Sequence, residues 1–368
     1  MSKILSLLPI SPKDVLRKGD SARDNFHTLY WLYLRENKQT AGLQAPITRR
    51  IRGWKDWFLT SSTILYDFET YGKEAYLNDW QYHRRIQVNG LERSFTDHKY
   101  AFDQMIRHNH AEVLPDLYGV VREGQMFEPP STAIASSVGE WVLKNLSDND
   151  KIVIKPEDGE GGEDIYIVSK KDGTLVINGE SASTTTLDQW TSDTVYVVTE
   201  FINQAEYSAE IYPHTTNTVR LLSLWDYENN EPYVADAIHR IGTDMSRPVD
   251  NWDKGGLSVA IDLNNGTLGQ ATRWPHSSTV EWYDVHPDNG QRIKGVEIPK
   301  WSELKTAVRE MASELWYMPM AAWDITVTKN GFKMLEANST PTINMMQVHR
   351  PLLLDERTRR FFEHHDVL

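Results

Sequence analysis

The chain has 368 residues, of which 40% are hydrophobic and 25% charged, and it contains no cysteine. A chain of this length is too long for one small hydrophobic core, so it predicts two or three packed subdomains. Its formal net charge of -13, without a concentrated run of Lys and Arg, argues against nucleic acid as a partner. The absence of cysteine excludes disulfides, thiolate catalysis and Cys-ligated metals.

The N-terminal residues 1–10 form a short apolar stretch that carries Lys3 and runs into Pro12 without a small-residue cleavage site. This pattern does not fit a signal peptide. No run in the sequence approaches the roughly 18 consecutive apolar residues that a membrane-spanning helix needs. We therefore expect a cytoplasmic protein without membrane insertion, and the sequence leaves the oligomeric state open.

Residues 1–95 show helical patterning with many aromatic side chains and contain no motif that predicts chemistry. Aromatic residues usually serve burial, so packing is favoured over ligand stacking as their role. We assign no site residue to this N-terminal helical region. The aromatic residues concerned are Tyr30, Trp31, Tyr33, Trp54, Trp57 and Phe58.

The pattern changes at Thr96, where the part of the chain with chemical motifs begins. A helix is expected from Lys99, followed by a strand near residues 113–115. Short runs separated by turns then predict strands in an antiparallel sheet. These strands are expected at residues 151–155, 165–168, 175–177, 195–198, 219–224, 233–241, 257–261, 324–328 and 332–336. A helix is expected at residues 302–315, where apolar residues keep helical spacing.

A glycine-rich loop, PEDGEGGED, occupies residues 156–164. Gly159, Gly161 and Gly162 would let backbone N–H groups approach a phosphate without obstruction by a Cβ atom. Glycine clusters are commonly only hairpin turns, and for this loop alone that interpretation is the better one.

Two common phosphate-binding motifs do not fit this loop. A Walker A loop ends in Lys and Ser or Thr before a helix, whereas here Lys155 precedes the loop and a strand follows it. A dinucleotide fingerprint also requires a helix at its last glycine. What remains is a strand lysine beside a flexible flap, an arrangement that suits an ammonium group meeting phosphate oxygens beneath a lid.

Residues 322–338 predict a β-hairpin around Asn330 and Gly331. A two-residue loop would place Asp324 opposite Ala337 and away from Glu336. A three-residue loop over residues 329–331, with Gly331 in the left-handed conformation, places Asp324 opposite Glu336 and on one face with Asn338. We predict the three-residue loop.

The predicted register gathers two carboxylates and an amide oxygen on one face of the hairpin. Such hard oxygen ligands suit Mg²⁺, which keeps substrate phosphates among its other ligands. Asp324 and Glu336 could instead be solvent-facing residues balanced by Lys329 or Lys333, and the hairpin alone does not decide between the two interpretations. The presence of Lys155 and the glycine-rich loop in the same chain favours the metal site.

Taken in order, these motifs resemble the ATP-grasp superfamily. The motifs between the flap and the hairpin resemble the sugar-transfer-associated ATP-grasp proteins and, more distantly, the ligases that add glutamate to a ribosomal protein. The resemblance covers roughly residues 95–350. The motifs are Asp97 and Lys99; Lys155 and the glycine-rich loop; NTVR at 217–220; HRIG at 239–242; DNWDKGG at 250–256; and EANSTP at 336–341.

The resemblance implies an α+β fold in which two subdomains hold ATP between antiparallel sheets. We expect an N-terminal part at residues 1–95, a small lobe with the flap at 96–200 and a large lobe with the metal hairpin at 201–368. It further implies that Lys99 and Lys155 bind the ATP phosphates and that two Mg²⁺ ions are bound by Asp324, Glu336 and Asn338.

By the same resemblance, the backbone of Glu200, Phe201 and Ile202 would recognise adenine, and Glu206 or Glu210 would bind ribose; we assign Glu206. Arg220, Arg240 and Asn251 would face the γ-phosphate and the acyl phosphate. Each residue also has a structural alternative: the arginines could be ion-paired strand residues, Asn251 a turn residue and Lys99 a solvated residue at a helix start.

The predicted activity is an ATP-dependent carboxylate–amine ligation through an acyl phosphate, with release of ADP and phosphate. The substrates would be a small-molecule, carbohydrate or peptide carboxylate and an amine. Phosphoryl transfer to a hydroxyl, or another outcome without an amide, is an alternative that the sequence does not separate from ligation. A nucleotide-binding module without turnover is a second alternative, which the presence of both lysines and all three metal ligands disfavours.

Overall fold

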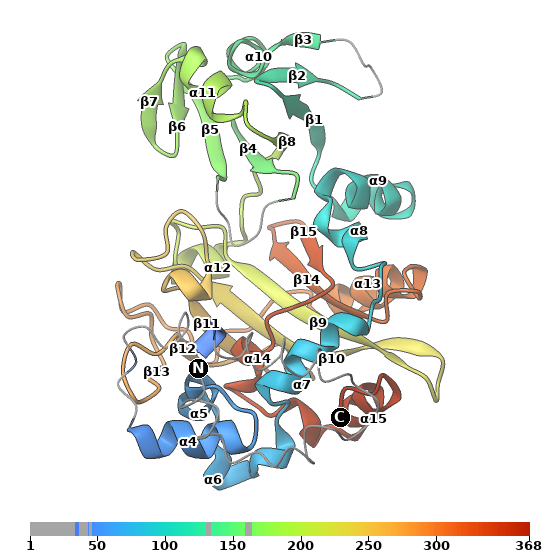
Figure 1. Cartoon of the computed structure of the whole chain (residues 1–368). Helices are drawn as coiled ribbons and strands as arrows, with labels where there is room; N and C mark the ends of the chain where they lie inside the picture. The colour runs from blue at the N-terminus through green and yellow to red at the C-terminus, as the bar shows by residue number, and fades with distance from the viewer. Residues whose placement is uncertain (1–33, 37–42, 44–45, 130–133, 159–163) are drawn as a thin grey trace.

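The computed structural model describes residues 34–36, 43, 46–129, 134–158 and 164–368 (Figure 1). The glycine-rich loop prediction at Gly159, Gly161 and Gly162 therefore lies outside the described residues. Helices and two antiparallel sheets alternate along the chain, which confirms the predicted α+β class. No helix among the described residues is long and apolar enough to cross a membrane.

The N-terminal part is a group of short helices, α4 (Ile47–Lys55), α5 (Thr60–Leu65), α6 (Phe68–Tyr71) and α7 (Asp79–Arg84). Their aromatic residues form a buried cluster in which the rings of Tyr66 and Tyr76 stack at 4.5 Å and Phe68 lies 4.8 Å from Phe58. Phe58 is 2% exposed, so its predicted packing role is confirmed.

The first sheet has eight strands in the order β3-β2-β1-β8-β4-β5-β6-β7. In β4, alternate residues Ile152 and Ile154 are buried beneath α10 (Val138–Asn145) and α11 (Thr184–Trp190), so Lys155 points to the opposite side. The prediction of a strand near residues 113–115 is wrong, because residues 111–113 form a 3-10 turn and the strand begins at Leu117. The strands are β1 (Leu117–Arg122), β2 (Gln125–Phe127), β3 (Ile134–Ser137), β4 (Lys151–Pro156), β5 (Tyr166–Lys171), β6 (Thr174–Ile177), β7 (Glu180–Ala182) and β8 (Val195–Glu200).

The second sheet has seven strands in the order β13-β12-β11-β10-β9-β14-β15. Helix α13 (Trp301–Glu314), close to its predicted position, covers one face with Leu304 and Val308. The N-terminal helices, α14 (Asn344–Gln347) and α15 (Glu356–His364) pack on Leu222 and Leu224 of the other face. The strands are β9 (Thr218–Asp226), β10 (Glu231–Ile241), β11 (Leu257–Ile261), β12 (Leu268–Arg273), β13 (Trp282–Tyr283), β14 (Met320–Val327) and β15 (Phe332–Asn338).

Three further helices lie near the junction of the two sheets: α8 (Ser94–Asp97), α9 (Lys99–His110) and α12 (Glu206–Ile211). In Figure 1 the first sheet lies above the second, with α9 and α8 beside the junction and β15 below it. Because β15 is an edge strand of the second sheet, its residues are available to a site between the sheets.

Candidate active site

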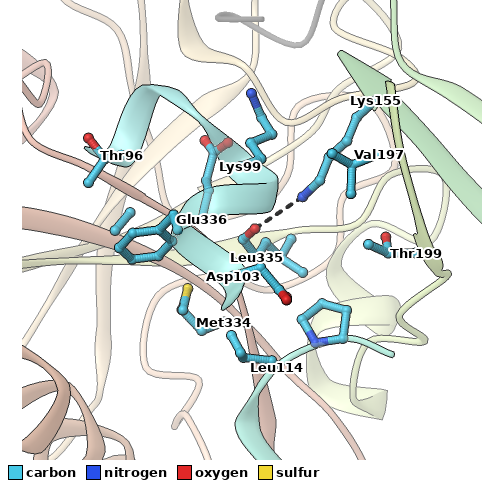
Figure 2. A pocket seen from close by; sticks show the side chains of 13 residues that line it. Thr96, Lys99, Asp103, Leu114, Lys155, Val197, Thr199, Met334, Leu335 and Glu336 are labelled. Carbon is cyan, nitrogen blue, oxygen red and sulfur yellow. Dashed lines mark hydrogen bonds between the residues drawn. The ribbon is translucent and has the colours of Figure 1, made fainter. Parts of the chain in front are cut away.

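A pocket lies between the two sheets and is lined by 13 residues of α8, α9, β4, β8, β15 and the segment before β1 (Figure 2). It contains both lysines predicted to bind phosphate and one of the predicted metal ligands, Glu336. The lining residues are Thr96, Lys99, Phe102, Asp103, Leu114, Pro115, Lys155, Val197, Thr199, Met334, Leu335, Glu336 and Ala337. Segments more than 200 residues apart in the sequence thus meet in one pocket.

Lys155 spans the pocket from β4 to β15, where its Nζ donates a hydrogen bond to the backbone oxygen of Leu335 at 3.1 Å (Figure 2). Burial lowers the pKa of Lys155; the carboxylate of Glu336 offsets part of this shift, and the charge of Lys99 adds to it. A lysine held in this way favours an anionic ligand, because an anion would replace lost hydration with direct charge pairing.

Lys99 is the first residue of α9, as predicted, and its side chain lies beside the pocket with Lys155 (Figure 2). Glu157, which follows β4, accepts hydrogen bonds from two amides at the start of this helix. Its backbone oxygen accepts from the amide of Lys99 at 3.1 Å, and its Oε2 accepts from that of Tyr100 at 2.8 Å. Glu157 therefore links the end of β4 to the helix that carries Lys99.

The predicted adenine hinge begins at Glu200, the last residue of β8. The amide of Glu200 donates to Asp116 O at 2.9 Å, and the amide of Phe201 donates to Lys151 O at 3.3 Å. The backbone N–H of Ile202 donates to none of the residues that the structure describes, so it is the hinge amide available to a base. Glu206 is exposed in the first turn of α12, and no contact of its side chain tests the ribose assignment.

The hairpin of β14 and β15 has the predicted register at its functional end: Asp324 pairs with Glu336 and Ala322 with Asn338. The loop predicted to produce this register was wrong. Val327 pairs with Phe332, so the loop has four residues, and Gly331 does not have a positive φ. A β-bulge at Leu335 restores the Asp324–Glu336 pairing, and the carbonyl of this extra residue accepts from Lys155.

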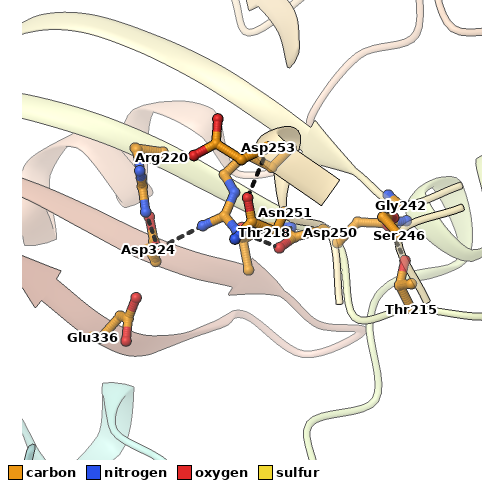
Figure 3. A network of polar contacts seen from close by, with 12 residues as sticks. Thr215, Thr218, Arg220, Gly242, Ser246, Asp250, Asn251, Asp253, Asp324 and Glu336 are labelled. Atoms are coloured by element: carbon orange, nitrogen blue, oxygen red, sulfur yellow. Dashed lines mark hydrogen bonds and ion pairs between the residues drawn. The ribbon is translucent and has the colours of Figure 1, made fainter. Parts of the chain in front are cut away.

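Arg220 lies opposite Asp324 on the neighbouring strand β9 and binds it with two hydrogen bonds (Figure 3). Its Nε and Nη2 donate to the two carboxylate oxygens, each at 2.6 Å. Asp324 is 2% exposed; burial would raise its pKa, but the charges of Arg220 and Arg240 outweigh burial and lower it. Burial opposes the charge of Arg220 as well, and Asp324 reverses this effect and raises the pKa of Arg220.

Arg240 extends this pair into a chain of alternating charges (Figure 3). Its Nη1 donates to Asp324 Oδ2 at 2.8 Å and its Nη2 to Asp250 Oδ1 at 2.7 Å. The other oxygen of Asp250 accepts from the amide and hydroxyl of Thr218 at 3.0 and 2.5 Å. Asp250 was not assigned a role from the sequence, although its position directly before Asn251 in the 250–256 motif could have suggested one.

Asn251 was predicted to face the transferred phosphoryl group, and in the structure its side chain caps a short turn. Its Oδ1 accepts from the amide of Asp253 at 2.9 Å and begins the 3-10 turn of Trp252–Lys254. Figure 3 shows it beside Asp250, next to the arginine chain. The structure thus brings Asn251 to the site and also shows the turn role that the sequence left as an alternative.

The residues at the end of the hairpin fit a divalent cation. Asp324 and Glu336 are direct cross-strand partners, and Glu336 Oε1 lies 3.4 Å from Asn338 Nδ2. Two adjacent carboxyl groups with an amide oxygen form a hard-oxygen donor set, and a cation would relieve their repulsion. Both oxygens of Asp324 already bind guanidinium groups, so Glu336 and Asn338 have the greater freedom to coordinate.

Comparison with known proteins places this site in a family. Residues 80–361 match the family model described as sugar-transfer associated ATP-grasp. No curated protein matches the chain.

Several solved structures are similar at low identity. A D-alanine–D-alanine ligase from Bacillus anthracis is 12% identical over 73% of this chain and 69% of that chain, with a TM-score of 0.35. A RimK domain ATP-grasp protein from Sphaerobacter thermophilus is 10% identical over 73% and 69%, with a TM-score of 0.39. The ADP complex of purK, an N5-carboxyaminoimidazole ribonucleotide synthetase, is 12% identical over 71% and 52%, with a TM-score of 0.39.

The family model spans more than half of the chain and includes every predicted site residue from Lys99 to Asn338. The resemblance drawn from the sequence motifs is confirmed at this level: the chain belongs to the sugar-transfer-associated ATP-grasp family.

Proposed function

We propose that the protein is an ATP-dependent carboxylate–amine ligase that forms an amide through an acyl phosphate. The observation that carries this proposal is the pocket between the sheets, where Lys99, Lys155 and Glu336 face one space. The two lysine ammonium groups suit the phosphates of ATP, and the adjacent carboxylate suits the metal ion that ATP carries. A neutral ligand would use neither charge. In this proposal residues 96–200 and 201–368 are the two lobes that hold the nucleotide.

The nucleotide would lie with its base at the hinge of Glu200, Phe201 and Ile202, its ribose near Glu206 and its phosphates between the two lysines. Glu336 and Asn338, with Asp324, would hold two Mg²⁺ ions. When bound, these ions would neutralise phosphate charge and so favour attack on the γ-phosphate.

Arg220 and Arg240 would stabilise negative charge on the transferred phosphoryl group. Their pairing with Asp324 does not use all of their N–H groups. Arg220 Nη1 donates to the sulfur of Met345 at 3.6 Å, and the buried Arg240 Nε has no hydrogen-bond partner among the described residues. A phosphoryl oxygen is a stronger hydrogen-bond acceptor than the thioether sulfur of Met345, and it would give Arg240 Nε an acceptor. Asn251 would lie beside them.

The reaction would proceed in two displacements. A carboxylate oxygen of the first substrate attacks the γ-phosphorus, the bond to the β–γ bridging oxygen breaks, and ADP leaves. The amine of the second substrate then attacks the acyl carbon, loses a proton and displaces phosphate with its bonding electrons. Positioning and charge neutralisation accomplish both steps, and no protein nucleophile is needed.

The test uses ¹⁸O-labelled carboxylates with a panel of amines, ATP and Mg²⁺. An acyl phosphate route transfers one ¹⁸O from the carboxylate to the released phosphate, and mass spectrometry detects it together with ADP and an amide. A phosphorylated product without free phosphate would instead show transfer to a hydroxyl and contradict the proposal. Unlabelled phosphate released alongside an amide would contradict the acyl phosphate.

A further inference from the structure

The segment between α7 and α9 lies against the end of the hairpin that carries the proposed metal ligands. In Figure 1 this segment rises from α7 through α8 to α9 and passes beside β14 and β15. The sequence assigned no role to residues up to 95. Three of its residues nevertheless bind the main chain directly beyond Asn338, and these contacts connect the N-terminal part to the site.

Asn89 joins the two hairpin strands beyond their last paired residues, Ala322 and Asn338. Its Nδ2 donates to Met320 O at 2.7 Å and to Ser339 O at 2.8 Å, and its Oδ1 accepts from the amide of Met320 at 3.2 Å. Asn89 is 2% exposed, so these bonds do not compete with water. One side chain therefore binds the start of β14 and the residue that follows β15.

Ser339, the neighbour of Asn338, is held at every polar group. Its carbonyl accepts from Asn89, its amide donates to Thr96 Oγ1 at 3.2 Å, and its hydroxyl donates to Arg93 O at 3.0 Å. The buried Arg85 continues the contact, because its Nη2 donates to Thr340 O at 3.0 Å and its Nε to Pro341 O at 3.1 Å. The backbone after Asn338 thus has little freedom to move.

We propose that Asn89 is a positioning residue that sets the metal-binding geometry of Asn338 and Glu336. This proposal rests on the metal site of the proposed function. A metal ligand must keep its donor atom within a few tenths of an ångström of its place, and β15 is the edge strand of its sheet in the part of the chain that the structure describes. Asn89 ties the end of this strand to β14, because it binds the backbone of both Met320 and Ser339.

The experiment measures Mn²⁺ binding to the full-length protein by electron paramagnetic resonance, with a non-hydrolysable ATP analogue present. The variants are Asn89→Ala and Asn89→Ser, whose hydroxyl is too short to bind both carbonyl groups. Asn289→Ala is the matched control, because Asn289 also binds two backbone groups, Ile211 O at the end of α12 at 2.9 Å and the amide of Gln291 at 3.0 Å. Circular dichroism reports whether each variant is folded.

Loss of a residue that orients metal ligands typically weakens metal binding tenfold to a hundredfold. We expect folded Asn89→Ala to bind Mn²⁺ about tenfold more weakly than the wild type, with Asn89→Ser between them and Asn289→Ala unchanged. Equal Mn²⁺ affinity in folded Asn89→Ala would overturn the proposal, as would unfolding of both variants, which would make Asn89 a residue of general stability. Failure of the wild type to bind Mn²⁺ would instead count against the proposed metal site itself.

Discussion

Asp250 illustrates, at the scale of single residues, how the site depends on a residue that was not predicted to bind ATP or metal. One of its oxygens binds Arg240 and the other the amide and hydroxyl of Thr218. It therefore fixes the guanidinium that also reaches Asp324. Burial raises the pKa of Asp250, and the charge of Arg240 opposes that shift.

Replacing this carboxylate tests the arrangement. Asp250→Asn keeps an oxygen for Arg240 but removes the charge and offers an N–H where Thr218 needs an acceptor. Because a small displacement of a catalytic group can cost up to about a hundredfold, we expect ADP release to fall roughly tenfold to a hundredfold. Asp262→Asn, an exposed change directly after β11, should match the wild type. Equal activity of the two variants would contradict the positioning of Arg240 by Asp250.

His239 is a second residue whose surroundings predict a measurable effect. Its Nε2 lies 3.1 Å from Tyr207 Oη and its Nδ1 3.1 Å from the backbone oxygen of Arg240, and it is fully buried. Burial lowers the pKa of His239 to about 4. The folded protein therefore resists protonation of this residue, whereas the unfolded chain takes up the proton near pH 6.5.

The stability contributed by neutral His239 is complete above about pH 6.5 and is lost as the pH falls towards 4. The shift corresponds to about 3 kcal/mol of unfolding free energy. The half-buried Asp236 acts in the opposite direction, because burial raises its pKa to about 7 and protonation on acidification favours the folded state. Urea unfolding of the wild type and His239→Gln at several pH values isolates the histidine: the variant should lose less stability than the wild type between pH 6.5 and 4.5. Parallel curves would contradict the assignment.

At the scale of elements, the β14–β15 hairpin shows both what the sequence could predict and what it could not. Alternation and the Asn330–Gly331 turn located the two strands, and the Asp324–Glu336 pairing was correct. The bulge at Leu335 was missed, because a bulge depends on how the neighbouring strand and Lys155 use the extra carbonyl. Short strands such as β2 and β13 were missed because two or three residues give no periodicity.

The ion pair across β9 and β14 gives the prediction at this scale. Arg220→Lys keeps the charge next to Asp324 but loses the planar two-bond geometry within a buried pair. We expect the free energy of unfolding in urea to fall by about 2 kcal/mol. The control is Arg309→Lys, whose pair with Glu231 at 3.0 Å is about half exposed and should contribute under about 1 kcal/mol. Equal losses in the two variants would contradict a buried structural role for the pair.

At the scale of the whole molecule, the site exists only because distant parts of the chain meet. Lys99, Lys155 and Glu336 were identified separately from a helix start, an alternating strand and a hairpin, and the pocket brings them together. The sequence left ion pairing of Arg220 and Arg240 as an alternative, but it could not predict Asp324 as their shared partner. The strand order β10-β9-β14, which brings the three residues together, is set by the packing of the whole sheet. The contribution of Asn89 was hidden for the same reason: its partners lie 231 and 250 residues away.

The central claim is that a nucleotide binds between the two sheets through Lys155, and calorimetric titration tests it most directly. A non-hydrolysable ATP analogue with Mg²⁺ is titrated into the wild type, Lys155→Ala and the control Lys170→Ala. Lys170 also donates to a backbone carbonyl, Leu143 O at 3.1 Å, but does not line the pocket. We expect binding to the wild type and to Lys170→Ala with equal affinity, and binding at least about tenfold weaker to Lys155→Ala. Unchanged affinity in Lys155→Ala would contradict the account.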